Sequence, residues 1–128
     1  MTVELTYLVY VVVFTMLMWV PYILNLIMVR GLSNAVGYPS DPKPMALWAQ
    51  RLKAAHYNAI ENLVIFAPLI LTAHVVGANG VATATCAMVY FAARVVHAIA
   101  YTFAIPWIRT LSFAVGVGAN LCIAAQLL

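Results

Sequence analysis

Long apolar runs are the feature that most constrains this chain. Of its 128 residues, 66% are hydrophobic and 7% are charged, with six Lys or Arg against three Asp or Glu. A soluble domain of ordinary composition carries roughly 25% charged residues. So few charged side chains cannot cover a water-facing surface, and the sequence therefore predicts a protein whose solvent is the lipid bilayer. This composition excludes a soluble enzyme and a nucleic-acid-binding protein.

The apolar runs are long enough for four membrane-spanning helices. A helix needs about 20 apolar residues to cross a bilayer. We expect an all-α, four-transmembrane-helix bundle that forms a single domain over residues 1–128, with approximate spans 5–29, 46–76, 81–103 and 107–128. Pro21 and Pro68 predict kinks in the first two spans, because proline removes a backbone hydrogen bond. The first run is too long for the apolar region of a signal peptide, so we expect it to be retained.

The longest connection of the chain lies between the first two spans. Residues 32–47 contain Gly37, Pro39, Pro42 and Pro44, which interrupt regular structure. We therefore expect a loop over this whole segment, and loops of this length are often functional or mobile.

The two cysteines both lie inside apolar runs. Cys86 and Cys122 have neither metal-ligand spacing nor CxxC spacing. We expect them to be small hydrophobic thiols in the core.

The basic residues all fall on one side of a four-span topology. They are Arg30, Lys43, Arg51, Lys53, Arg94 and Arg109. The other side has no Lys or Arg. By the positive-inside rule, the basic side is cytoplasmic and both termini lie on the non-cytoplasmic side.

Polar residues of three spans converge on this same side. They are Arg51, Asn58 and Glu61 on the second span, Arg94, His97 and Tyr101 on the third, and Arg109 and Thr110 at the start of the fourth. Their spacings of three, four and seven residues place them on one face of each helix or on adjoining stripes. Ionisable residues are costly in a membrane and mark a site or a pairing. Several cations with one carboxylate leave an excess of positive charge, which an anionic ligand or lipid headgroup would neutralise.

A structural explanation is open for each of these residues taken alone. Arg51 and Arg109 lie near the interface, where arginine side chains commonly snorkel. Glu61 and Arg94 could form an interhelical ion pair. His56 lies off the face that carries Arg51, and we expect a structural contact for it.

Three short motifs carry a resemblance to a known family. Arg51 precedes AHYNAIEN at residues 55–62, RVVHAIAY occupies residues 94–101, and PWIRT occupies residues 106–110. In this order they resemble the signatures of the second, third and fourth helices of the MAPEG family (membrane-associated proteins in eicosanoid and glutathione metabolism). The resemblance covers essentially the whole chain.

The resemblance implies a homotrimer of four-helix subunits in the membrane, here a bacterial inner membrane, with glutathione bound between subunits near the cytoplasmic face. The residues implied for the glutathione site are Asn58, Glu61, His97, Tyr101 and Arg109, assisted by Arg30, Arg51 and Arg94. The implied catalytic pair is Arg109 and Thr110. The pKa of a free thiol is about 8.5, and the cation at the helix start would lower it, while the hydroxyl would donate a hydrogen bond to sulfur.

Three positions depart from the family pattern. Tyr57 and Ala54 stand where glutathione-using members often have basic residues. Phe113 stands where some members have a tyrosine that contacts the cofactor. Each departure removes one potential contact to a peptide that carries two carboxylates.

Two classes of function follow from these observations. The first is an integral membrane glutathione-dependent transferase or peroxidase, whose substrate is a lipophilic electrophile or a lipid hydroperoxide that arrives from the bilayer. The second is a non-catalytic membrane protein that binds anionic lipid or serves as an accessory subunit of a membrane complex. A transporter or channel ranks last, because the charges cluster at one end and leave no site at the midplane.

Overall fold

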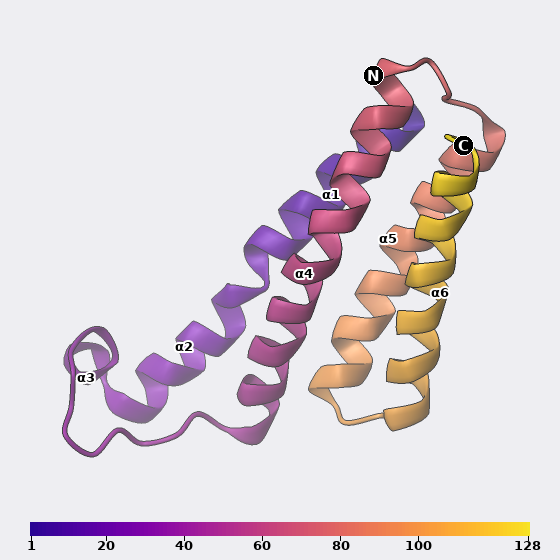
Figure 1. Ribbon diagram of the computed structural model, residues 1–128. Helices are drawn as coiled ribbons and strands as arrows, with labels where there is room; N and C mark the ends of the chain where they lie inside the picture. Colours follow the sequence, from indigo (N-terminus) through magenta and orange to yellow (C-terminus); the bar gives the residue numbers. More distant parts are fainter.

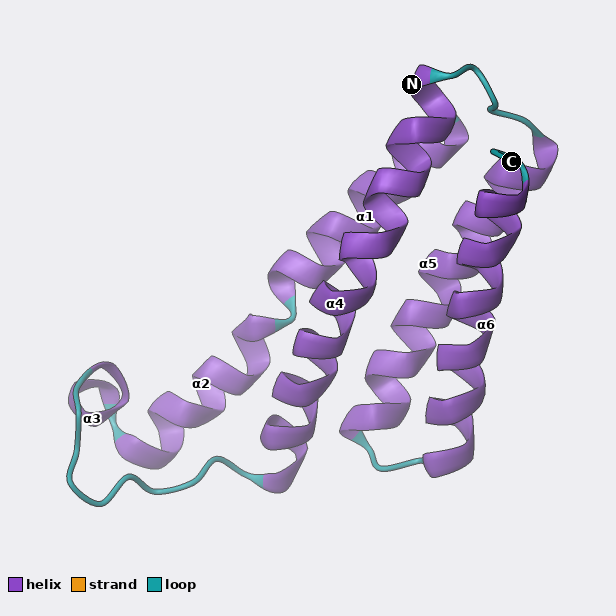
Figure 2. Cartoon of the chain, in the orientation of Figure 1, coloured by secondary structure: helices purple, strands orange, loops and turns teal.

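The computed structural model describes all of residues 1–128, and every regular element in it is a helix (Figure 2). The helices are α1 (Val3–Leu17), α2 (Trp19–Arg30), α3 (Leu32–Val36), α4 (Leu47–Val75), α5 (Val81–Thr102) and α6 (Pro106–Ala125). Four segments are long and apolar enough to cross a membrane: α1 with α2, α4, α5 and α6. The predicted all-α, four-span architecture is confirmed.

The four spans run side by side, and the connections between them lie at two opposite ends of the molecule (Figure 1). Both termini and the α4–α5 connection lie at one end, which we call the terminal end. The α5–α6 turn and the long connection before α4 lie at the opposite end, which we call the basic end. Helices α5 and α6 form an antiparallel hairpin, and α1 packs against both α4 and α5.

The first span bends in its middle. Pro21 has no N–H group to offer the carbonyl of Leu17 four residues earlier, so α1 ends at Leu17 and α2 begins at Trp19. At this break the N–H group of Met18 donates to the carbonyl of Thr15, three residues earlier, at 3.3 Å. The kink expected from Pro21 therefore lies three residues before it. Helix α4, by contrast, continues through Pro68 without interruption.

The connection from α2 to α4 is partly helical, so the prediction of a loop over all of residues 32–47 is wrong at its start. Gly31, with φ 76°, reverses the chain between α2 and the short helix α3. Two contacts then tie the connection to α2. The Arg30 Nε group donates to the Lys43 carbonyl at 2.7 Å, and the Ala46 N–H group donates to Asn25 Oδ1 at 2.9 Å.

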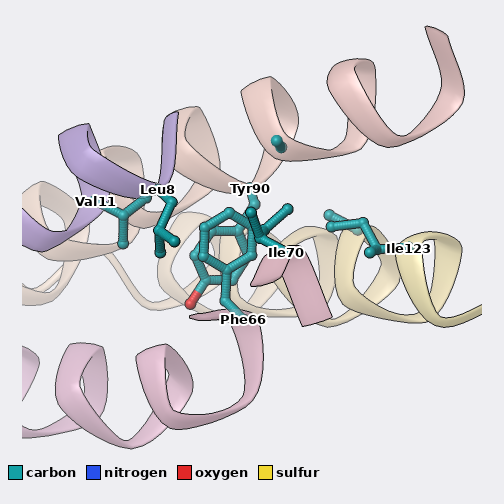
Figure 3. Packing of buried hydrophobic residues seen from close by; sticks show 8 residues of the cluster. Leu8, Val11, Phe66, Ile70, Tyr90 and Ile123 are labelled. Carbon is teal, nitrogen blue, oxygen red and sulfur yellow. The ribbon is translucent and has the colours of Figure 1, made fainter. Parts of the chain in front are cut away.

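Large side chains fill the core of the terminal half. The rings of Phe66 from α4 and Tyr90 from α5 stack with centroids 3.9 Å apart. Figure 3 shows Leu8 and Val11 on one side of this stack and Ile123 on the other. Each of the four spans contributes to this cluster, which therefore holds the bundle together at that level.

A disulfide joins α5 to α6 near the terminal end. It links Cys86 to Cys122, whose Cα atoms lie 6.6 Å apart. The expectation of two core thiols is therefore wrong. The antiparallel hairpin brings an early residue of α5 beside a late residue of α6, and a sequence separation of 36 gives no local signal of this pairing.

Glu4 links two spans at the terminal end, and it lies in the first turn of α1. Its side chain is only 3% exposed. The carboxylate accepts hydrogen bonds from the Thr83 hydroxyl at 2.5 Å and from the Gly80 N–H group at 3.2 Å. These donors belong to the start of α5, where a negative charge is favoured by the helix dipole. Glu4 thus fastens α1 to α5.

Candidate functional site

A cleft of about 290 Å³ opens between α4, α5 and α6 in the basic half of the bundle. Its lining residues are Asn58, His97, Tyr101, Arg109, Thr110 and Phe113. The structure therefore brings together five of the nine site residues predicted from the sequence, together with Phe113, one of the three departures from the family pattern.

The start of α6 positions the cation of the cleft. Pro106 occupies the first turn of α6, where an N–H group would have no acceptor within the helix, so proline costs no hydrogen bond. Arg109 follows one turn later and is exposed. Its guanidinium carbon lies 5.1 Å from the ring centroid of Tyr101, within range of a cation–π contact.

Aromatic rings form the wall of the cleft on the α5 side. His97 and Tyr101 are one turn apart on α5, and their ring centroids are 5.7 Å apart. The His97 ring also lies 6.1 Å from the ring of Phe113 on α6. His97 is buried, whereas Tyr101 is half-buried.

Arg94 lies behind the cleft. Its side chain is 2% exposed, and its Nη2 group donates to Asn58 Oδ1 at 2.7 Å. Glu61 is exposed on the outer side of α4. The interhelical ion pair considered for Arg94 and Glu61 is therefore not formed, and Asn58 takes the place of the carboxylate.

Three further predicted site residues lie outside the cleft. Arg30 is bound to the connection before α4 through the Lys43 carbonyl, in a recess of about 90 Å³. Arg51 is half-buried two turns before Asn58 on α4, towards the basic end, and Glu61 faces away from the bundle.

Two neighbours of the predicted site make contacts of their own. His56 Nδ1 lies 2.8 Å from the Tyr22 hydroxyl, so His56 links α4 to α2, as expected of a structural contact. Lys53 reaches one turn along α4 and places its ammonium 5.8 Å from the centroid of Tyr57, whose side chain is 54% exposed. The ammonium of Lys53 thus lies beside Tyr57, a position where glutathione-using members of the family often have a basic residue. The spacing of four residues between Lys53 and Tyr57 is the sequence signal from which this contact could have been predicted.

An apolar groove adjoins the cleft on its terminal side. This groove has a volume of about 320 Å³ and is lined by Asn62, Ile65, Leu69, Val117, Asn120, Leu121 and Ala124. Asn62 is one turn beyond Asn58 on α4, and Val117 is one turn beyond Phe113 on α6. The polar cleft is therefore followed, along the same two helices, by a groove whose lining is mainly apolar, with Asn62 and Asn120 as its polar residues.

The chemistry of the cleft is that of hydrogen-bond donation. Arg109 is a permanent donor, Asn58 and the two hydroxyls can donate, and no Asp or Glu lines the cleft. The Thr110 hydroxyl currently donates to the Pro106 carbonyl at 3.1 Å. A ligand with negatively charged oxygen or sulfur atoms matches this lining.

The fold and the cleft define an integral membrane protein of four helices whose polar residues gather at one end. Within that class, the family profile described as the MAPEG family matches residues 7–128. The chain therefore belongs to the MAPEG family, and the resemblance carried by the three motifs is confirmed. No curated protein and no solved structure matches the chain.

Proposed function

We propose that this protein is a glutathione-dependent transferase or peroxidase that acts on lipophilic electrophiles or lipid hydroperoxides. One observation carries the proposal: Arg109, Tyr101 and Asn58 surround a cleft that has hydrogen-bond donors and no carboxylate. Glutathione carries two carboxylates and a thiol, so its chemistry matches this lining. Membership of a family that includes such enzymes supports the same conclusion.

The proposed roles of the cleft residues follow from their chemistry. Arg109 stabilises negative charge on sulfur, because its guanidinium stays protonated and lies near a helix start. Tyr101 and Asn58 hold the peptide by hydrogen bonds. Thr110 donates to sulfur only after it releases the Pro106 carbonyl, because a hydroxyl has one proton. This exchange of partners is part of the proposal.

Two reactions are compatible with these roles. Conjugation joins the sulfur to an electrophilic carbon and expels the leaving group. Peroxide reduction consumes two thiols and one hydroperoxide and yields a disulfide, an alcohol and water. The apolar groove beyond the cleft suits the hydrophobic part of either lipophilic substrate.

We also propose that the subunits form a homotrimer whose cleft faces the cytoplasm of a bacterial inner membrane. Glu61, on the outer side of a membrane-spanning helix, is costly when it faces lipid. A neighbouring subunit that covers this side of α4 would remove that cost. Arg30 and Arg51 would then complete the site at the junction between subunits, together with Glu61.

A second candidate function is binding of an anionic phospholipid without catalysis. The observation in its favour is the apolar groove directly beside the donor-lined cleft, because a phosphate and an acyl chain would fit the two in sequence. This function also covers an accessory role in a larger membrane complex.

The two candidates are separated with the purified protein in detergent. Glutathione is supplied with 1-chloro-2,4-dinitrobenzene in one assay and with cumene hydroperoxide in another, and thermal stability is measured with and without glutathione. The proposal expects turnover in at least one assay and a glutathione-dependent rise in melting temperature. Absence of both, with phosphatidylglycerol raising the melting temperature instead, would establish the lipid-binding alternative.

A further inference from the structure

The contact between Arg94 and Asn58 fixes the orientation of a carboxamide. A guanidinium has donors only, so the Asn58 atom that lies 2.7 Å from Arg94 Nη2 must be the oxygen. The oxygen and nitrogen of a side-chain amide are assigned from their hydrogen-bonding neighbours, and the guanidinium of Arg94 permits only one assignment for Asn58.

A second donor acts on the same oxygen. The Asn62 Nδ2 group lies 3.3 Å from Asn58 Oδ1 and also donates to the Asn58 backbone carbonyl at 2.8 Å. The oxygen of Asn58 is therefore occupied from the protein side by two donors. Because Asn58 lines the cleft, its amide nitrogen, with two N–H groups, is what the carboxamide can offer to a ligand.

Packing alone does not favour arginine at position 94. Its side chain is almost fully buried, and its Nε and Nη1 groups have no hydrogen-bond partner. A buried cation with unpaired donors lowers the stability of the fold. The facing residue, Gly116, leaves room for it, since a Cβ atom there would lie 3.8 Å from Arg94 Cδ. The hydrogen bond to Asn58 is the one polar contact that the Arg94 side chain makes.

We propose that Arg94 is a positioning residue that sets the polarity of the cleft and does not bind the ligand itself. It holds the Asn58 oxygen away from the cleft, so the cleft presents N–H groups and selects a ligand with a carboxylate at that point. Without Arg94 the carboxamide is free to turn its oxygen towards the ligand and repel it. The identity of the ligand as glutathione rests on the proposed function, whereas the action of Arg94 on Asn58 does not.

The first test needs no ligand. Arg94→Met, Asn58→Ala and the double variant are compared with the native protein by thermal unfolding in detergent. Asn58→Ala leaves the buried cation with no partner, so Arg94→Met raises the melting temperature more in the Asn58→Ala background than in the native one, where it also removes the hydrogen bond to Asn58. An equal effect of Arg94→Met in both backgrounds would overturn the pairing. Arg94→Leu, which also removes every donor, replaces Arg94→Met in the same cycle if that variant does not fold.

The second test measures the affinity for glutathione by calorimetry. Arg94→Met weakens binding about tenfold in the native background and not at all in the Asn58→Ala background. Arg94→Lys recovers part of the loss, and Gly116→Ala, which adds a methyl group beside Arg94 and keeps the hydrogen bond, leaves affinity unchanged. A tenfold loss in both backgrounds means that Arg94 contacts the ligand directly and refutes the positioning role.

Failure of the proposed function gives a different result from failure of this inference. If the native protein does not bind glutathione, the proposed function is wrong, and the unfolding cycle still decides whether Arg94 holds Asn58. If the native protein binds glutathione but the unfolding cycle shows no coupling, the proposed function stands and the inference about Arg94 is wrong.

Discussion

The same four spans build two differently packed halves of the molecule. In the terminal half, the buried apolar cluster includes Phe66, Ile70, Tyr90 and Ile123, which are among the largest fully buried side chains. In the basic half, the corresponding cluster consists of Met18 and three alanines. Large side chains fill one half, and small ones leave the other half with less buried volume. The comparison indicates that apolar packing is concentrated away from the cleft.

The charged side chains and the disulfide also differ between the two halves. At the terminal end, Glu4 has two donors, and the disulfide between Cys86 and Cys122 adds a covalent link. In the basic half, Arg94 keeps two unpaired donor groups, and Arg109 is exposed. Unpaired buried polar atoms occur in both halves, for example the Tyr90 hydroxyl in the terminal half, so the difference between the halves lies in the links at one end and the cations at the other. Four substitutions test whether stability and ligand chemistry are separated in this way.

Phe66→Ala is expected to have the largest effect on stability. It removes one ring of the central stack and leaves a cavity, so the free energy of unfolding falls by about 3–5 kcal/mol. Affinity for glutathione in the folded fraction stays unchanged, because Phe66 lies two turns from Asn58. Tyr90→Phe is the matched control. It removes only a buried hydroxyl that has no partner, so it changes stability by less than about 1 kcal/mol. Equal loss of stability and affinity in Phe66→Ala would show that the two halves are not separate.

Arg109→Ala gives the opposite pattern. Its side chain is exposed, so the melting temperature changes little, whereas kcat/KM with glutathione falls by about 100-fold or more because stabilisation of charge on sulfur is lost. Steady-state rates with a chromogenic electrophile measure this change. Lys43→Ala serves as the control, since it removes another cation from the basic end but keeps the backbone carbonyl that Arg30 binds. The proposed role is refuted if both variants lose activity equally.

Loss of the disulfide tests the covalent part of the terminal half. Replacement of Cys86 and Cys122 by alanine lowers the free energy of unfolding by about 2–4 kcal/mol. A phosphine reductant lowers the melting temperature of the native protein and leaves that of the double variant unchanged. Turnover below the melting temperature is the same in both proteins. Insensitivity of the native protein to reductant would mean that the bond does not stabilise this half.

Glu4→Gln is expected to have the smallest effect of the four. The amide keeps one acceptor for Thr83 but loses the charge that favours the start of α5, so stability falls by about 1–2 kcal/mol. Chemical unfolding in detergent measures the loss. Asp41→Asn, in the exposed connection before α4, neutralises another carboxylate and should have no measurable effect. A similar loss in both variants would point to net charge as the cause.

Hydropathy and helical periodicity were sufficient to predict the four spans and most of the cleft. Residues three, four or seven apart share a face of a helix wherever the helix packs, which is why His97 and Tyr101 line the cleft with Asn58 as expected. Periodicity does not determine which neighbour a face meets. For that reason Glu61 was the partner considered for Arg94, whereas the structure gives it Asn58.

The contacts that the sequence did not predict join residues far apart in the chain. Glu4 meets Thr83 across 79 positions, and Cys86 meets Cys122 across 36. Such pairs depend on how α1, α5 and α6 align, and no local pattern records that alignment. The short helix α3 was missed for another reason, because five residues are too few to show a period.

The disulfide also bears on when and where the chain matures. Disulfides persist in oxidising compartments and are rare in the cytosol. We therefore expect an oxidised Cys86–Cys122 pair where the terminal end faces an oxidising compartment, which is the orientation that the positive-inside rule predicts from different residues. Cys86 lies on α5 and Cys122 on α6, so the bond can form only once these two helices lie side by side. The oxidation state of this pair would then report the orientation of the inserted protein, because a protein inserted in the opposite sense would keep two free thiols.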